Sequence, residues 1–168
     1  MSAKKTAFYG MFLALALVAG YIEQLIPINL GIPGVKLGLA NIVTMLLLYI
    51  VGVPAACLIS VLRILLSGFL FGSGFAMVYS AAGAATSMLV MALLKKTKKF
   101  SSVGVSVAGG IFHNVGQIIV AMLVLETKAL AYYLPILILS GLAAGILIGI
   151  LSGIFTKRLN PIIKQHFL

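Results

Sequence analysis

Long runs without a charged residue dominate the chain. These runs cover residues 6–22, 37–62, 64–94, 100–125 and 129–156. Most of them reach or exceed the ~20 residues with which an α-helix crosses about 30 Å of hydrocarbon. The pattern therefore predicts an all-α protein whose helices span a membrane at least five times.

Two of the long runs contain residues that break helices. Pro54 follows Gly52 within the second run, and proline both lacks an amide hydrogen and disfavours helical geometry in the residue before it. The stretch Gly72-Ser73-Gly74 interrupts the third run. Turns at both places predict a six-transmembrane-helix bundle in one integral membrane domain over residues 1–168, with helices over 6–26, 38–52, 54–70, 75–94, 104–125 and 131–156.

The distribution of positive charge supports six spans over five. Twelve Lys and Arg against two acidic residues give a formal net charge of +10. With six spans, the clusters at Lys4-Lys5, Lys95–Lys99 and Lys157-Arg158 all fall on one side, which the positive-inside rule assigns to the cytoplasm. Five spans would divide them between the two sides. We therefore expect a multi-pass protein of the cell membrane with both termini in the cytoplasm, and no nucleic-acid partner.

The inventory of reactive residues argues against catalysis by the chain alone. There is no aspartate, so no aspartate-rich motif can hold magnesium on a diphosphate, and no G-x-x-x-x-G-K-[ST] loop is present. His113 and His166 have no cysteine or carboxylate at zinc-ligand spacing, and Cys57 is the single cysteine. We expect a protein that is not an enzyme and that holds neither a metal nor a cofactor.

Polar residues within the apolar runs are the candidates for function, because such residues are costly in a membrane. At about 1.5 Å per residue from the turn at Pro54, Arg63 lies roughly 14 Å deep, near the midplane. His113 and Asn114 fall at a similar depth in the fifth helix. Gln117 lies one turn further out on the same face.

Other polar residues approach this level from the outer side. Glu23 lies near the outer end of the first helix, Asn41 near the outer end of the second, and Lys36 in the loop between them. The polar groups thus run from the outer surface to mid-membrane and stop there, which predicts a pocket open to the outside with Arg63 at its floor as the partner of a carboxylate or phosphate. The alternative is that Arg63 pairs internally with Glu23 and that the amides bond between helices.

Small residues at four-residue spacing mark two helices for close packing. In the last helix they form a ridge that either packs inside the bundle or docks another protein, and we favour packing. In the first helix the two alternatives are equal. The residues are Gly141, Gly145, Gly149 and Gly153 in the last helix, and Gly10, Ala14, Ala16 and Gly20 in the first.

Several segments together resemble one known family. They are residues 34–41 (GVKLGLAN), Arg63, residues 71–74 (FGSG) and residues 109–117 (GGIFHNVGQ). This set looks like the Gx transporter family, also labelled heptaprenyl diphosphate synthase component I. The likeness covers essentially the whole chain.

The resemblance implies a relation to the substrate-binding S components of bacterial energy-coupling-factor (ECF) transporters, which are six-helix proteins. It implies a site for an anionic or heteroaromatic vitamin or precursor, with a transmembrane T component and two ATPases as partners. It also implies docking through the small residues of the first helix. The rival hypothesis is a non-catalytic accessory subunit in prenyl diphosphate or menaquinone metabolism, or in quinone- or flavin-linked electron transfer. A purely structural membrane adaptor is a third.

Overall fold

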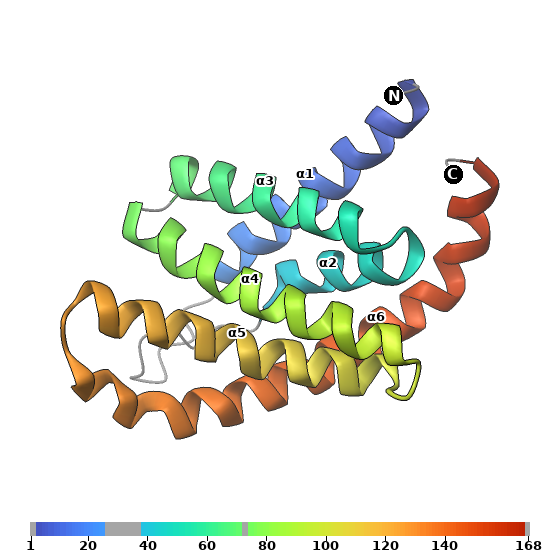
Figure 1. Cartoon of the computed structure of the whole chain (residues 1–168). Helices are drawn as coiled ribbons and strands as arrows, with labels where there is room; N and C mark the ends of the chain where they lie inside the picture. The colour runs from blue at the N-terminus through green and yellow to red at the C-terminus, as the bar shows by residue number, and fades with distance from the viewer. Residues whose placement is uncertain (1–2, 26–37, 72–73, 167–168) are drawn as a thin grey trace.

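The computed structural model describes residues 3–25, 38–71 and 74–166. Within these residues the chain forms six α-helices and one short 3-10 helix (Figure 1). The all-helical fold that the sequence predicts is therefore confirmed. The elements are α1 (Ala3–Leu25), α2 (Leu39–Ile50), α3 (Val53–Phe71), α4 (Gly74–Thr97), α5 (Ser102–Val124), η1 (Lys128–Tyr133) and α6 (Leu134–His166).

The chain turns where the helix-breaking residues predict it. Between α2 and α3, Gly52 takes a φ of 132°, a backbone conformation that residues with a side chain rarely adopt. Pro54 then falls in the first turn of α3, where its missing amide hydrogen leaves no helical hydrogen bond unmade. Further along, α3 ends at Phe71 and α4 begins at Gly74, so the FGSG segment separates two helices.

Helices α2 and α6 depart from the prediction in ways that affect the fold. Helix α2 has 12 residues, or about 18 Å at 1.5 Å per residue, which is less than the ~20 residues that usually cross the hydrocarbon. Helix α6 continues ten residues past the predicted end at residue 156, through Pro161. The charges at Lys157 and Arg158 end the apolar run but not the helix, because Ile163 is buried and anchors the last turns.

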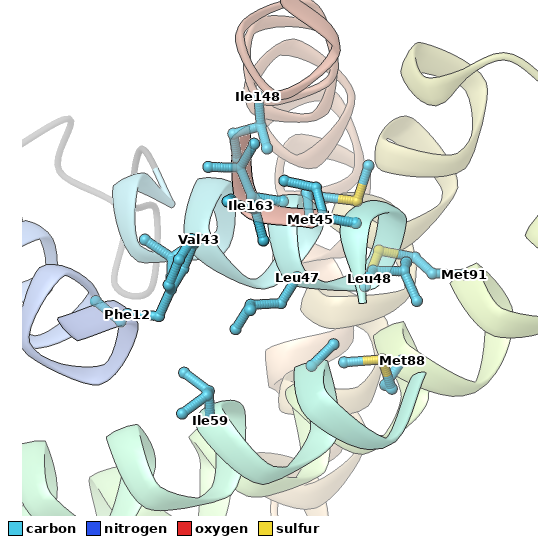
Figure 2. Close-up of a cluster of buried hydrophobic side chains, with 14 of the residues drawn as sticks. Phe12, Val43, Met45, Leu47, Leu48, Ile59, Met88, Met91, Ile148 and Ile163 are labelled. Atoms are coloured by element: carbon cyan, nitrogen blue, oxygen red, sulfur yellow. The ribbon is translucent and has the colours of Figure 1, made fainter. Parts of the chain in front are cut away.

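Helix α2 lies inside the bundle. Eight of its 12 residues are buried, among them Met45, Leu47 and Leu48, which are almost completely enclosed. Figure 2 shows these side chains between Phe12 of α1, Ile59 of α3, Met88 and Met91 of α4, and Ile148 and Ile163 of α6. The hydrophobic core is thus built around α2.

Helices α5 and α6 pack through their glycines. A Cβ on Gly110 would lie 2.4 Å from the carbonyl oxygen of Gly141, and a Cβ on Gly145 would lie 2.6 Å from Val107 Cα. Further along α6, a Cβ on Gly149 would lie 2.6 Å from Val103 Cα. The structure therefore places the glycine ridge of α6 inside the bundle, against α5.

The two ends of the bundle differ in which connections they carry. In Figure 1 the first turn of α1 and the last turn of α6 lie at the same end as the α2–α3 and α4–α5 turns. The end of α1, the end of α3 and the end of α5 lie at the opposite end. We call the first of these the basic end, because it carries Lys4, Lys5, Lys96, Lys98, Lys99, Lys157, Arg158 and Lys164, all exposed.

The outer surface of the bundle is apolar. Five helices are long and apolar enough to cross a membrane, namely α1, α3, α4, α5 and α6. Large hydrophobic side chains on them point away from the core: Phe69 is 80% exposed and Leu123 is 72% exposed. Such surfaces belong in lipid, so this chain is a multi-pass membrane protein in contact with the bilayer.

Candidate functional site

A cavity of about 140 Å³ lies between the helices, and every α-helix contributes to its wall. Its polar residues come from separate helices and meet only because the bundle closes around them. They include Glu23 of α1, Asn41 of α2, Arg63 of α3, Ser80 of α4 and Asn114 of α5, while α6 contributes Gly141, Ala144 and Ile148.

The cavity brings together the polar residues that the sequence analysis selected by their estimated depth in the membrane. Arg63, Asn41, Glu23, His113, Asn114 and Gln117 all line the same cavity. Lys36 lies outside the described residues, as does the side chain of His166. Six residues chosen from one sequence pattern thus share one wall, although four different helices carry them.

Arg63 has an unusual environment. Its Nε is buried and, among the described residues, meets no hydrogen-bond partner. The charge of Glu23 interacts with that of Arg63 across the cavity, which is the internal pairing considered as the alternative to a pocket. Because the guanidinium is always charged and presents five donors, Glu23 alone leaves part of its hydrogen-bonding capacity unused. Arg63 therefore lines the cavity as a cation whose hydrogen-bonding capacity Glu23 alone does not use up.

Glu23 is held in place by the start of α2. Its Oε1 accepts a hydrogen bond from the backbone N–H of Gly38. Gly38 has a φ of 75° and is the residue that begins α2, so the carboxylate joins the end of α1 to the beginning of α2. One carboxylate oxygen is engaged there, and Glu23 lines the same cavity as Arg63.

The amides of α5 have different roles. Asn114 Nδ2 donates to the carbonyl oxygen of Leu137 at 2.6 Å and to Ser140 Oγ at 3.3 Å, so it joins α5 to α6 beside the cavity. Gln117 lies against Gly83 of α4, where an added Cβ would come within 2.8 Å of Gln117 Cγ. Asn114 thus lines the cavity and also bonds two helices to each other. The second of these roles is the one that the alternative to a binding pocket predicts for the amides.

The expectation that the polar groups stop at mid-membrane is wrong. A second cavity of about 30 Å³ shares Asn41 and His113 with the first and lies nearer the basic end. Four hydroxyl side chains line this second cavity, and each lies one or two helical turns from a polar residue of the first cavity on the same helix. The pairs are Thr44 and Asn41, Ser60 and Arg63, Ser87 and Ser80, and Ser106 and His113. A space of this size holds one or two water molecules.

These hydroxyl groups were missed because serine and threonine are common in membrane helices. Ser60, Ser87 and Ser106 are buried, at 4% to 7% exposure. Their spacing from Arg63, Ser80 and His113 is the signal that could have found them, since residues three, four or seven apart share a helix face.

The small residues of α1 lie on two different faces. Gly10 and Ala14 are exposed, and a Cβ on Gly10 would meet nothing within 4 Å. Ala16 is completely buried, and a Cβ on Gly20 would lie 3.9 Å from Ala40 Cβ. The structure therefore separates one exposed pair from a second pair that packs inside the bundle.

Comparison with known proteins identifies a family for this chain. No curated protein and no solved structure matches the chain significantly. A family model, by contrast, matches residues 12–155, which cover four of the six helices completely, most of α1 and α6, and every described residue of the cavity wall. By that match, the chain belongs to the heptaprenyl diphosphate synthase component I family.

Proposed function

We propose that this protein is the substrate-binding membrane subunit of an uptake system. In this role it resembles the S components of ECF transporters and takes a small anionic or heteroaromatic vitamin or precursor. The observation that carries the proposal is the cavity that Arg63, a permanently charged residue near the middle of α3, lines together with Asn41 and Gln117. A buried guanidinium donor is costly in a membrane unless a ligand satisfies it.

The size of the cavity favours a small solute. Its volume of about 140 Å³ is close to that of engineered cavities of about 150 Å³, which take a benzene-sized molecule. A long prenyl chain needs far more space. The polar side chains in the wall likewise suit a ligand with hydrogen-bonding groups better than a hydrocarbon chain.

The second candidate function is that of an accessory subunit in prenyl diphosphate or menaquinone metabolism, or in quinone- or flavin-linked electron transfer. The observation that favours it is the name of the matched family, which describes a component of a synthase. The chain has no aspartate. For that reason we propose that it does not itself catalyse the synthase reaction, and that any such role is to hold a product or an enzyme at the membrane.

The proposed transport role requires partners. We propose that a transmembrane T component docks on α1 at the exposed residues Gly10 and Ala14, and that two ATPases supply the energy. The basic end of the bundle then faces the cytoplasm, together with both termini. The larger cavity lies further from the basic end than the second cavity does, and it receives its ligand from the outside.

Native mass spectrometry of the detergent-purified protein tests the two functions against each other. A bound vitamin-like molecule or a bound T component supports the uptake subunit. A prenyl lipid bound together with a synthase subunit overturns it in favour of the accessory role.

Substitution of Arg63 tests the site itself. We expect Arg63→Gln to weaken binding of the copurified small molecule by more than tenfold, because losing one partner of a buried charged hydrogen bond costs about 2–5 kcal/mol. Arg158→Gln removes an exposed arginine at the basic end and serves as the matched control. Affinity within about twofold of the parent in Arg63→Gln would remove this residue from the site.

A further inference from the structure

We infer that the ligand of this cavity is a small zwitterion, whose anionic group pairs with Arg63 and whose cationic nitrogen pairs with Glu23. The inference rests on the proposed function, since it requires that the cavity binds a solute. It goes further by specifying the charge that the solute must carry.

The first step is a count of charges around the cavity. Among the described residues of its wall, Glu23 and Arg63 are the formally charged ones at pH 7, and His113 is formally neutral. Their charges cancel. A simple anion would therefore leave one uncompensated negative charge within the bundle, and a simple cation one positive charge. Uncompensated charge is costly where water is largely excluded.

The second step concerns what each charged group has left to offer. Arg63 lines the cavity and is permanently charged, so an anionic group placed there gains a charge-assisted interaction with its guanidinium. Glu23 uses its Oε1 for the N–H of Gly38, and a carboxylate can accept several hydrogen bonds, so it has capacity for a cationic donor as well. A ligand that carries both an anionic and a cationic group satisfies the two residues together without changing the net charge.

The third step is the placement of the two groups. Glu23 lies two residues before the end of α1, at the end of the bundle opposite the basic end, whereas Arg63 lies near the middle of α3. Both residues line the same cavity, so the two side chains border a common space. Ligand groups bound to both would lie along the depth of the cavity, with the anionic group innermost.

Three sets of small compounds of matched length test the inference. The first set is the ω-amino acids from glycine to 6-aminohexanoate, which are zwitterions; the second is the corresponding carboxylic acids; the third is the corresponding primary amines. Thermal unfolding of the detergent-purified protein is followed with a thiol-reactive dye, because Cys57 is the single cysteine and half-buried. We expect at least one zwitterion to raise the unfolding temperature, and its matched acid and amine to have little effect.

Glu23→Gln provides the sharper test. The glutamine side chain keeps an oxygen that can accept the Gly38 hydrogen bond, but it removes the negative charge. We expect the affinity for the acid, divided by that for the zwitterion, to rise by about tenfold or more. The reason is that Glu23 then no longer balances the positive charge of Arg63. Glu126→Gln, which removes an exposed acidic residue outside the cavity, should leave the ratio unchanged.

The outcomes separate this inference from the proposed function. If carboxylic acids stabilise the parent protein as well as zwitterions do, or if Glu23→Gln does not change the ratio, the inference is wrong and the uptake function stands. If no set stabilises the protein and no small molecule copurifies with it, both are wrong. A preference for the zwitterion that Glu23→Gln reverses supports the inference.

Discussion

Polar side chains that look alike in the sequence differ in what they hold together. Asn114 donates both to the Leu137 carbonyl oxygen and to Ser140 Oγ, and so joins α5 to α6. For Gln117, one turn away and lining the same cavity, the structure gives no such bond among the described residues. The two amides are therefore expected to respond differently to substitution.

Replacing each amide by alanine separates stability from binding. We expect Asn114→Ala to lower the free energy of unfolding by about 0.6–1.7 kcal/mol, the range for hydrogen bonds between membrane helices. The Leu137 carbonyl oxygen still accepts from Ser140 Oγ, which keeps the loss modest. Gln117→Ala should change stability less and ligand affinity more. Titration with SDS in mixed micelles measures stability, and equal losses in the two variants would contradict this assignment.

At the scale of elements, α2 depends on a lysine from a distant helix. Lys95 Nζ, near the end of α4, donates to the Leu48 carbonyl oxygen in the last turn of α2, and it lies 5.2 Å from the centre of the Tyr49 ring. A positive charge near the last carbonyl groups of a helix is favourable, and here it also fixes α2 against α4.

This contact predicts a stability difference between neighbouring lysines. Lys95→Met should destabilise the protein by about 1–2 kcal/mol, since a hydrogen bond and a cation–π contact are both lost. Lys96→Met changes an exposed residue and should stay within about 0.5 kcal/mol of the parent. Unfolding in mixed micelles compares them, and similar values for the two variants would show that Lys95 does not hold α2.

The contact between α5 and α6 tolerates almost no added volume. Gly110→Ala would place a Cβ 2.4 Å from the Gly141 carbonyl oxygen, and backbone on both sides leaves no flexible side chain to move away. We expect a loss of about 1–3 kcal/mol or more, the usual cost of overpacking. Gly10→Ala meets nothing within 4 Å and is the matched control. If both alanine variants unfold at the same temperature, the close contact is not a determinant of stability.

At the scale of the whole molecule, the orientation depends on whether α2 carries the chain across the membrane. With six crossings, Lys5 and Lys98 are on the same side, because α1, α2, α3 and α4 lie between them. If α2 does not cross, they are on opposite sides. Under the positive-inside rule we expect six crossings, with both residues on the cytoplasmic side.

Labelling of single cysteines distinguishes these topologies. In a Cys57→Ser background, Lys128→Cys should react with a membrane-impermeant maleimide in intact cells. Lys5→Cys and Lys98→Cys should react only after the cells are opened. Reaction of Lys5→Cys in intact cells would show that the chain crosses the membrane five times.

Much of the fold could be predicted from the order of residues. The uncharged runs indicate membrane helices because hydrocarbon accepts few charges, and Pro54 and the FGSG segment mark turns because of their backbone chemistry. Helix lengths were less predictable. Helix α2 is bounded by Gly38 and Gly52, both at positive φ, whereas α6 continues beyond Lys157 and Arg158 because Ile163 packs against the core.

The candidate site was predictable in part. Arg63, His113 and Asn114 stand out because polar groups are rare in apolar runs, and helical rise gives them a common depth. The hydroxyls of Ser60 and Ser106 did not stand out, because serine is common in membrane helices and only a shared cavity gives the two a joint role.

The sequence by itself determined that this chain is a membrane protein of six helices with polar groups at mid-depth, because hydropathy, charge and backbone chemistry act locally along the chain. The tertiary structure decided that Glu23 and Arg63 face one cavity, that the ridge of α6 packs against α5, and that Ala16 is buried while Ala14 is exposed. These facts depend on how helices rotate and approach one another. Rotation and approach follow from side-chain packing between distant segments, which no single stretch of the sequence contains.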